Sequence, residues 1–150
     1  GGAGKAVEDG IRFCGQEIRY AESVVSCDDL AVSDVSPLLE LDRVKSLNLS
    51  GSGLLDFDVV RHIGSLEYLH VKDTDIQDIG PLAGHDSIVF LNLANTQVTS
   101  IASLKEMPAL TTVNLTGAAI LEDTALSKQQ VSELRESRPD LDIIGFMDEI

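Results

Sequence analysis

The chain of 150 residues contains no tryptophan, two tyrosines and four phenylalanines, so its core cannot be built around large aromatic rings. Leucine, isoleucine and valine are abundant instead, and these branched aliphatic side chains must fill the interior at the usual packing density. A domain of this size buries roughly 70% of the surface that its unfolded chain exposes. The length therefore predicts a single domain.

Basic residues are scarce as well, with 11 against 25 acidic residues and a formal charge of −14. A charge of this sign repels nucleic-acid phosphates and anionic lipid, so we expect no nucleic-acid partner. No apolar run approaches the ~18–20 residues that cross a bilayer, so we expect no membrane insertion. The chain begins Gly1-Gly2-Ala3-Gly4 without methionine, so a removed export signal would leave no trace. The compartment stays open, with export favoured over the cytoplasm.

Only two cysteines are present, Cys14 and Cys27. They could form a disulfide that ties the N-terminal segment to the residues around Cys27, which would imply an oxidising compartment. They could equally be two small buried thiols that pack as hydrophobic residues. Two cysteines alone do not decide between these interpretations.

The sequence does contain a repeat with a spacing of 22 residues. Four six-residue segments superpose without gaps at this spacing: Val44–Leu49, Leu66–Val71, Ile88–Leu93 and Leu110–Leu115. A fifth copy begins at Glu22, which gives five repeats over residues 22–131. At the seven core positions of these copies 31 of 35 residues are apolar, against about 15 expected from the 43% hydrophobic composition. Chance does not explain the pattern.

Each copy contains an alternating segment followed by apolar residues three apart. The alternation predicts a short strand, and the spacing of three predicts a 3-10 or helical return. Because one copy cannot bury its apolar side alone, the copies must stack into a parallel sheet with strands about 4.8 Å apart. Ser52, Thr74 and Thr96 recur after the strand, where an inward hydroxyl can bond the loop backbone, and Leu30 and Ala118 interrupt this series.

The segments 32–38 (VSDVSPL) and 76–82 (IQDIGPL) resemble the I-x-D-I-x-P-L signature of the 22-residue class of leucine-rich repeats. That class occurs in bacterial internalins and in the phosphatase-1 regulatory subunit family, and residues 22–131 carry the resemblance. The resemblance implies an α/β solenoid with a parallel sheet on its concave face and short 3-10, helical or extended returns on its convex face. It also implies a recognition scaffold, without naming a partner or a functional residue.

The ends of the stack need covers, because terminal repeats expose apolar faces. Residues 11–14 and 17–20 alternate on either side of Gly15-Gln16, which predicts a hairpin cap within residues 1–21. At the other end Ser127 and Gln130 have capping-box spacing, and a helix opening at Ser127 would turn Val131 and Leu134 inward. Pro139 then ends this helix, and residues 141–144 form a strand. The predicted C-terminal cap spans residues 127–150.

Candidate catalytic and metal-binding patterns are weak. His62 and His85 fall on predicted outer turns and His70 on a strand, so the three cannot converge. His85-Asp86-Ser87 has the residue types of a catalytic triad, but sequence neighbours do not form one. Residues 73–78 (DTDIQD) suggest calcium, yet they lack the EF-hand glycine and terminal glutamate. Gly51-Ser52-Gly53 and Gly4-Lys5 match only fragments of a phosphate loop. We expect no enzyme activity, no metal and no cofactor.

The side chains that face away from the core are the better candidates for function. The third, fifth and seventh positions of the copies give Val24, Ser26, Asp28, Ser46, Asn48, Ser50, Tyr68, His70, Lys72, Phe90, Asn92, Ala94, Thr112, Asn114 and Thr116. Two aromatic side chains, Tyr68 and Phe90, should lie exposed beside one another. Aromatic residues flanked by amides are typical of binding hot spots, although Tyr and Phe also simply favour strands.

We therefore predict a monomeric, non-enzymatic module that binds a protein partner on the concave sheet. The predicted site comprises Tyr68, Phe90, His70, Asn92, Lys72, Asn48 and Asn114. The alternative is a structural repeat module of a larger exported or cell-surface protein. The sequence does not identify the partner.

Overall fold

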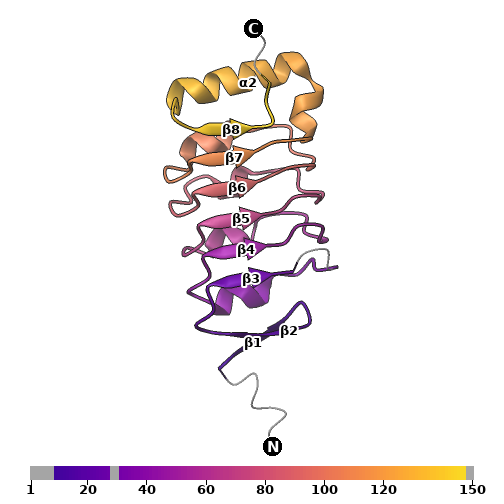
Figure 1. The fold of residues 1–150 in the computed structure, drawn as a ribbon, viewed down its shortest axis with the longest axis vertical. Helices are drawn as coiled ribbons and strands as arrows, with labels where there is room; N and C mark the ends of the chain where they lie inside the picture. The colour runs from indigo at the N-terminus through magenta and orange to yellow at the C-terminus, as the bar shows by residue number, and fades with distance from the viewer. Residues whose placement is uncertain (1–8, 28–30, 148–150) are drawn as a thin grey trace, which may run out of the picture.

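Six short parallel strands form one sheet along the molecule in the computed structural model, which describes residues 9–27 and 31–147. The strands are β3 (Val24–Ser26), β4 (Ser46–Asn48), β5 (Tyr68–His70), β6 (Phe90–Asn92), β7 (Thr112–Asn114) and β8 (Asp142–Ile144). They follow one another in chain order, and Figure 1 shows them stacked from the N-terminal to the C-terminal end. Asp28 and Leu30, for which the sequence made predictions, lie outside the described residues.

The register of the sheet follows the spacing seen in the sequence. From β3 to β7 each strand pairs with residues 22 positions further on, as Leu47 with Leu69 and Leu69 with Leu91. The step from Val113 to Ile143 is 30 residues because the last return contains helix α2 (Thr124–Ser137). The middle residue of every strand is buried, so the strands contribute one continuous row to the core.

The returns between strands each contain a short 3-10 helix. These are η1 (Ser36–Glu40), η2 (Val60–His62), η3 (Gly80–Leu82), η4 (Ala102–Glu106) and η5 (Ala119–Glu122). Aspartates start the first three returns: the Oδ1 atoms of Asp34, Asp56 and Asp78 each accept the backbone N–H two residues later. The bonds from Ser36 hold the pKa of the Asp34 carboxyl below its usual value. An aspartate at this position thus sets the start of the turn.

The predicted inward hydroxyls are confirmed. Thr74 Oγ1 donates to the Val71 carbonyl and Thr96 Oγ1 to the Leu93 carbonyl, both at 2.7 Å. Ser52 Oγ accepts the N–H of Leu54 at 3.3 Å. All three side chains are buried, so each hydroxyl satisfies a backbone group that water does not reach.

An antiparallel hairpin precedes the main sheet, as predicted, with strands β1 (Gly10–Phe13) and β2 (Gln16–Arg19). The expected turn at Gly15-Gln16 is wrong by one residue, because the chain reverses at Cys14-Gly15. Both residues have positive φ, 43° and 73°, which a tight two-residue hairpin turn requires. The hairpin buries Ile11, Phe13 and Ile18 in the core.

A disulfide and side-chain bonds join the hairpin segment to β3. Cys14 and Cys27 are bonded in the structure, with their Cα atoms 6.0 Å apart. Gln16 Nε2 donates to the Ser26 carbonyl at 2.7 Å, and Glu22 Oε1 accepts the N–H of Val24 at 3.3 Å. On the outer edge of β3, the Val24 N–H and the Ser26 carbonyl therefore have side-chain partners.

Helix α2 covers the C-terminal end, but the predicted capping box at Ser127 is wrong. Asp123 is the N-cap, and its Oδ1 accepts the N–H of Leu126 at 3.0 Å. An aspartate caps as well as a serine and also carries a charge that the helix N-terminus favours, so the helix starts one turn earlier. Ser127 lies inside the helix, buried. Val131 and Leu134 face the core as predicted, and β8 follows after Pro139.

Two polar residues fasten α2 to the preceding return: Gln130, which the sequence predicted as part of a capping box, and Arg138, which the sequence did not single out. Gln130 Oε1 accepts the N–H of Ile101 at 2.8 Å, and its Nε2 donates to the Thr99 carbonyl at 3.2 Å. The Arg138 guanidinium donates to three carbonyls, those of Leu104, Met107 and Leu110. These side chains complete the backbone hydrogen bonding around η4.

Candidate binding face of the sheet

The first and third residues of strands β3 to β8 point away from the core and define what we call the open face. The register places them in two rows. The first row is Val24, Ser46, Tyr68, Phe90, Thr112 and Asp142, and the second is Ser26, Asn48, His70, Asn92, Asn114 and Ile144. The open face corresponds to the concave face predicted from the sequence.

Tyr68 and Phe90 lie directly opposite one another on β5 and β6. Tyr68 is 45% exposed, as expected. Phe90 is only half-buried rather than fully exposed, because its ring contacts the ring of His70, with centroids 5.2 Å apart and planes inclined by 37°. Tyr68 is the strand partner of Phe90, and we call Tyr68, His70 and Phe90 the aromatic cluster in the middle of the sheet.

His70 is the titratable member of this cluster. Its side chain is half-buried, and this burial lowers the pKa of the imidazole below 6.5. A buried site disfavours the charged imidazolium. The ring is therefore predominantly neutral at pH 7 and packs on Phe90 as an aromatic group rather than as a cation.

The asparagines of the second row have a structural role that the sequence did not reveal. Asn48, Asn92 and Asn114 each accept, through Oδ1, the backbone N–H two residues later at 3.0 Å. These bonds turn the chain at the end of each strand and fix the orientation of each amide. Within residues 9–27 and 31–147 no bond is formed by their Nδ2 groups. The predicted polar column thus contributes hydrogen-bond donors to the open face.

The third expected column is wrong for two residues. Ser50 and Ala94 are buried, whereas Lys72 and Thr116 are exposed. The strands end before this column, and the chain bends inward there: Ser50 Oγ accepts the N–H of Lys72 at 3.1 Å. The residues that follow the column, Gly51, Asp73, Asn95 and Gly117, all have positive φ. Asn, Asp and Gly tolerate this conformation, which is a signal that sequence reasoning missed.

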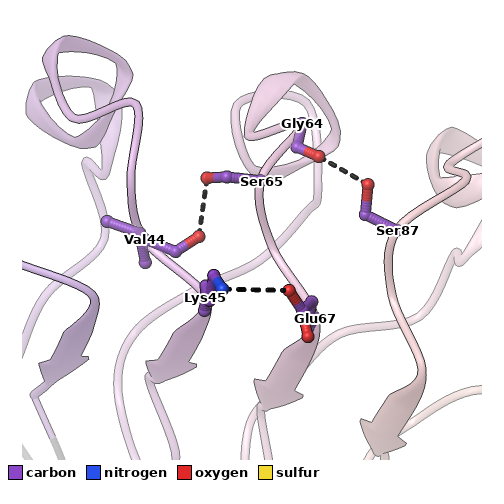
Figure 2. A network of polar contacts seen from close by, with 6 residues as sticks. All are labelled: Val44, Lys45, Gly64, Ser65, Glu67 and Ser87. Carbon is purple, nitrogen blue, oxygen red and sulfur yellow. Dashed lines mark hydrogen bonds and ion pairs between the residues drawn. The ribbon is translucent and has the colours of Figure 1, made fainter.

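Hydrogen bonds and an ion pair connect neighbouring repeats where the chain enters the strands, as Figure 2 shows. Ser65 Oγ donates to the Val44 carbonyl and Ser87 Oγ to the Gly64 carbonyl, both at 2.6 Å. Lys45 Nζ lies 3.9 Å from Glu67 Oε2. Both charged groups are partly exposed, so this ion pair stabilises the fold little, but it partly neutralises Lys45.

His85 is a structural residue and not a member of a catalytic triad. It lies on the return after η3, as predicted, and its side chain is buried. Its Nε2 lies 2.9 Å from the Ile63 carbonyl, and its Nδ1 accepts the N–H groups of Ser87 and Ile88 at 3.3 Å. A carbonyl can only accept, so Nε2 carries the proton. Both ring nitrogens are thus bonded to backbone groups.

The acidic segment 73–78 is likewise tied to its own surroundings. Asp73 accepts the Asn95 amide at 2.9 Å, Asp78 accepts the Gly80 N–H at 2.7 Å, and Ile76 between them is buried. Among the described residues, no group of three His, Cys, Asp or Glu side chains could hold a metal ion.

Comparison with known proteins identifies the architecture. No protein-family model and no curated protein match the chain. Solved structures do: an internalin (inlF) from Listeria monocytogenes is 27% identical with a TM-score of 0.55, and the match covers 63% of this chain and 28% of the internalin. The chain has the fold of bacterial leucine-rich-repeat proteins.

Two further leucine-rich-repeat neighbours agree on the fold. An internalin C2 (inlC2) from Listeria monocytogenes is 22% identical with a TM-score of 0.58, over 64% of this chain and 42% of the internalin. A leucine-rich-repeat protein from Leptospira interrogans is 17% identical with a TM-score of 0.68, over 81% of this chain and 30% of that protein. The chain thus spans less than half the length of each neighbour.

Proposed function

We propose that this leucine-rich-repeat chain is a protein-recognition module that binds its partner on the open face, with Tyr68 and Phe90 as anchors. The observation that carries the proposal is the placement of a 45% exposed tyrosine opposite a phenylalanine in the middle of the sheet. Large aromatic side chains dominate the energetics of binding hot spots, and soluble proteins rarely leave them clustered at the surface without use.

Polar groups around the aromatic cluster would supply specificity. Asn48, Asn92 and Asn114 offer Nδ2 donors, the imidazole of His70 lies within the cluster, and Lys72 follows β5. The five intervals between six strands extend about 24 Å at ~4.8 Å each. A partner would need most of the open face to reach the ~800 Å² per side of a standard interface. The proposal therefore favours a small partner element.

A capture experiment with matched variants tests this proposal. The wild-type chain and the double variant Tyr68→Ala with Phe90→Ala are immobilised and exposed to extract from the source cells. We expect the double variant to lose the specific partner, whereas Leu55→Ala, which removes a 64% exposed side chain away from the open face, retains it. Equal capture by the folded double variant would refute the hot spot.

We further propose that the module is monomeric and has no enzyme activity or cofactor. The absence of converging acid, base and nucleophile on the open face supports this, because the titratable side chains there are His70 and Tyr68 at the centre and Asp142 at the end. Light scattering should give 16.1 kDa, and turnover in a broad hydrolase screen would overturn the proposal.

The division of the chain that we propose is a hairpin cap within residues 1–21, five repeats over residues 22–131 and a cap over residues 127–150. The register of 22 supports the central part, and the separate hairpin sheet and α2 support the caps. Limited proteolysis should leave the repeats as one fragment, whereas a stable internal cut between two repeats would contradict this division.

A second candidate function is a structural module of a larger exported or cell-surface protein. The Cys14–Cys27 disulfide favours an oxidising compartment. Within the described part of the chain, no helix has the length and apolar character needed to span a membrane. Fractionation with an antibody against this chain tests the candidate. A band far larger than 16.1 kDa in the exported fraction would support it, and a band of 16.1 kDa in the cytoplasm would refute it.

A further inference from the structure

The open face presents hydrogen-bond donors to a partner. The Oδ1 atoms of Asn48, Asn92 and Asn114 are bonded to backbone N–H groups, so Nδ2 is the group of each amide that can still bond a partner. A matching partner must therefore offer free acceptors. Helices and sheets use their backbone carbonyls internally, whereas a polyproline II segment has no internal hydrogen bonds and leaves every carbonyl free.

The spacing of these donors distinguishes between the backbone conformations that a partner segment could adopt. Asn48 and Asn92 lie two strands apart in the second row, which corresponds to about 9.6 Å. Polyproline II repeats every three residues, at about 9.3 Å, so carbonyls on one side of the segment meet both donors. The two-residue repeat of a β-strand, about 6.8 Å, and the 5.4 Å pitch of an α-helix do not match this interval.

The aromatic cluster lies where such a segment would need it. Tyr68 and His70 belong to β5, between the strands that carry Asn48 and Asn92, and Phe90 is the next residue of the first row. Aromatic surfaces are what polyproline II ligands bind in other recognition domains, because flat rings pack against proline rings. The Tyr68 hydroxyl adds another donor.

Charge complementarity defines the ends of the segment. Among the described residues, the two rows of the open face contain one carboxylate, Asp142, at the far end, so the centre of the face suits an uncharged ligand. Beside the rows, the exposed carboxylates of Asp73 and Asp75 outnumber the exposed ammonium of Lys72, and the whole chain has a charge of −14. This field attracts a ligand with basic flanks. The ~24 Å of stacked strands corresponds to about eight residues at ~3.1 Å each.

We infer that the open face binds a proline-rich segment in the polyproline II conformation, about eight residues long with basic flanking residues. This inference rests on the proposed function, of which it specifies the partner class. Tyr68, His70 and Phe90 pack against the proline rings, and Asn48 and Asn92 donate to carbonyls of the segment.

Two charge-matched peptides test the inference by fluorescence anisotropy at ~150 mM salt, where long-range attraction is largely screened. Both peptides carry a fluorescent label. One consists of two lysines followed by eight prolines, and the other of two lysines followed by four Gly-Ser pairs. We expect the proline peptide to bind at least tenfold more tightly. Equal binding, or tighter binding of a Lys-Lys peptide with an alanine-rich helical sequence, would overturn the inference.

Single substitutions distinguish the contribution of the amide donors to peptide binding from that of the aromatic rings. Phe90→Ala should weaken binding of the proline peptide by about tenfold or more. Asn92→Asp keeps an acceptor for the Ala94 N–H but removes the outward donor, and loss of one hydrogen bond should weaken binding by about two- to tenfold. Thr112→Asp adds the same charge to the same face and removes a hydroxyl instead of an amide donor, and Leu55→Ala changes a side chain away from it. An identical effect of Asn92→Asp and Thr112→Asp in folded proteins would overturn the role of the amide.

The outcome also distinguishes this inference from the function on which it rests. If the proline peptide does not bind while the Tyr68→Ala, Phe90→Ala variant still loses its partner from cell extract, recognition by the open face stands and the polyproline II partner is wrong. If the proline peptide does not bind and the folded double variant still captures the partner, both proposals are wrong. Thermal melts of each variant verify that the fold is intact.

Discussion

Replacing Arg138 by methionine should destabilise the protein more than any other single change of a surface-accessible charge. The guanidinium is half-buried and donates to the carbonyls of Leu104, Met107 and Leu110. Methionine retains the aliphatic stem that packs beneath α2 but removes the guanidinium donor from all three carbonyls. The carbonyls of Leu104 and Met107 keep the backbone N–H groups of Met107 and Leu110, whereas the Leu110 carbonyl loses its side-chain donor.

The magnitude follows from the hydrogen bonds that are lost. A hydrogen bond to a charged group contributes about 1.5–3 kcal/mol, but three bonds that share one partly exposed guanidinium do not add in full. We expect the free energy of unfolding to fall by about 2–4 kcal/mol, which for a domain of this size lowers Tm by roughly 4–16 °C.

Urea and thermal unfolding followed by circular dichroism measure this effect. Arg61→Met is the matched control, because Arg61 is exposed on η2 and its substitution should change stability by less than ~0.5 kcal/mol. Arg138→Lys should fall in between, since an ammonium keeps the charge but cannot reach three carbonyls at once. If Arg138→Met unfolds at the same urea concentration as Arg61→Met, with an unchanged m-value, the bonds to η4 do not stabilise the fold.

Three further predictions concern the disulfide and the two buried or half-buried histidines. Thiol titration in denaturant without reductant should find no free thiol, and two thiols in that titration would refute the crosslink. Cys14→Ser with Cys27→Ala should lower the free energy of unfolding by about 3 kcal/mol, as expected for a crosslink across 13 residues. Because burial lowers the pKa of His70, the unfolded state binds a proton first on acidification, so stability should be constant above pH ~6.5 and fall below it. Urea midpoints at pH 7.5 and 5.5 should show a smaller difference in His70→Gln than in wild type, and equal differences would contradict the assignment. His85→Leu should lower the free energy of unfolding by about 1–3 kcal/mol, because the Ile63 carbonyl loses its partner inside the protein; a variant as stable as wild type in urea would show that water replaces the imidazole.

The repeat and the sheet could be predicted from the sequence because the signal is distributed. Apolar residues such as Leu47, Leu69 and Leu91 recur at one spacing, so an exception at one position does not alter the period. The hairpin, the inward threonines and the final strand followed from equally local rules of alternation and turn chemistry.

Contacts made by single polar side chains could not be predicted in the same way. The asparagines were expected to face a partner with the whole amide, but whether Oδ1 of Asn92 bonds Ala94 or water depends on how the chain turns after the strand. Ser50 and Ala94 were misplaced for the same reason, since alternation ceases where the strand ends. At the start of α2 both Asp123 and Ser127 are suitable N-cap residues. The structure uses Asp123, which makes the helix one turn longer.

The side chains along β3 have a consequence for self-association. Gln16 occupies the Ser26 carbonyl and Glu22 the Val24 N–H, while the hairpin that carries Gln16 is crosslinked through Cys14. A strand from another molecule would have to displace both side chains before it could pair with this edge. Head-to-tail growth of the sheet would pair this edge of one molecule with the C-terminal edge of another, so the occupied edge opposes filament formation, and pairing through the C-terminal edges alone would stop at a dimer.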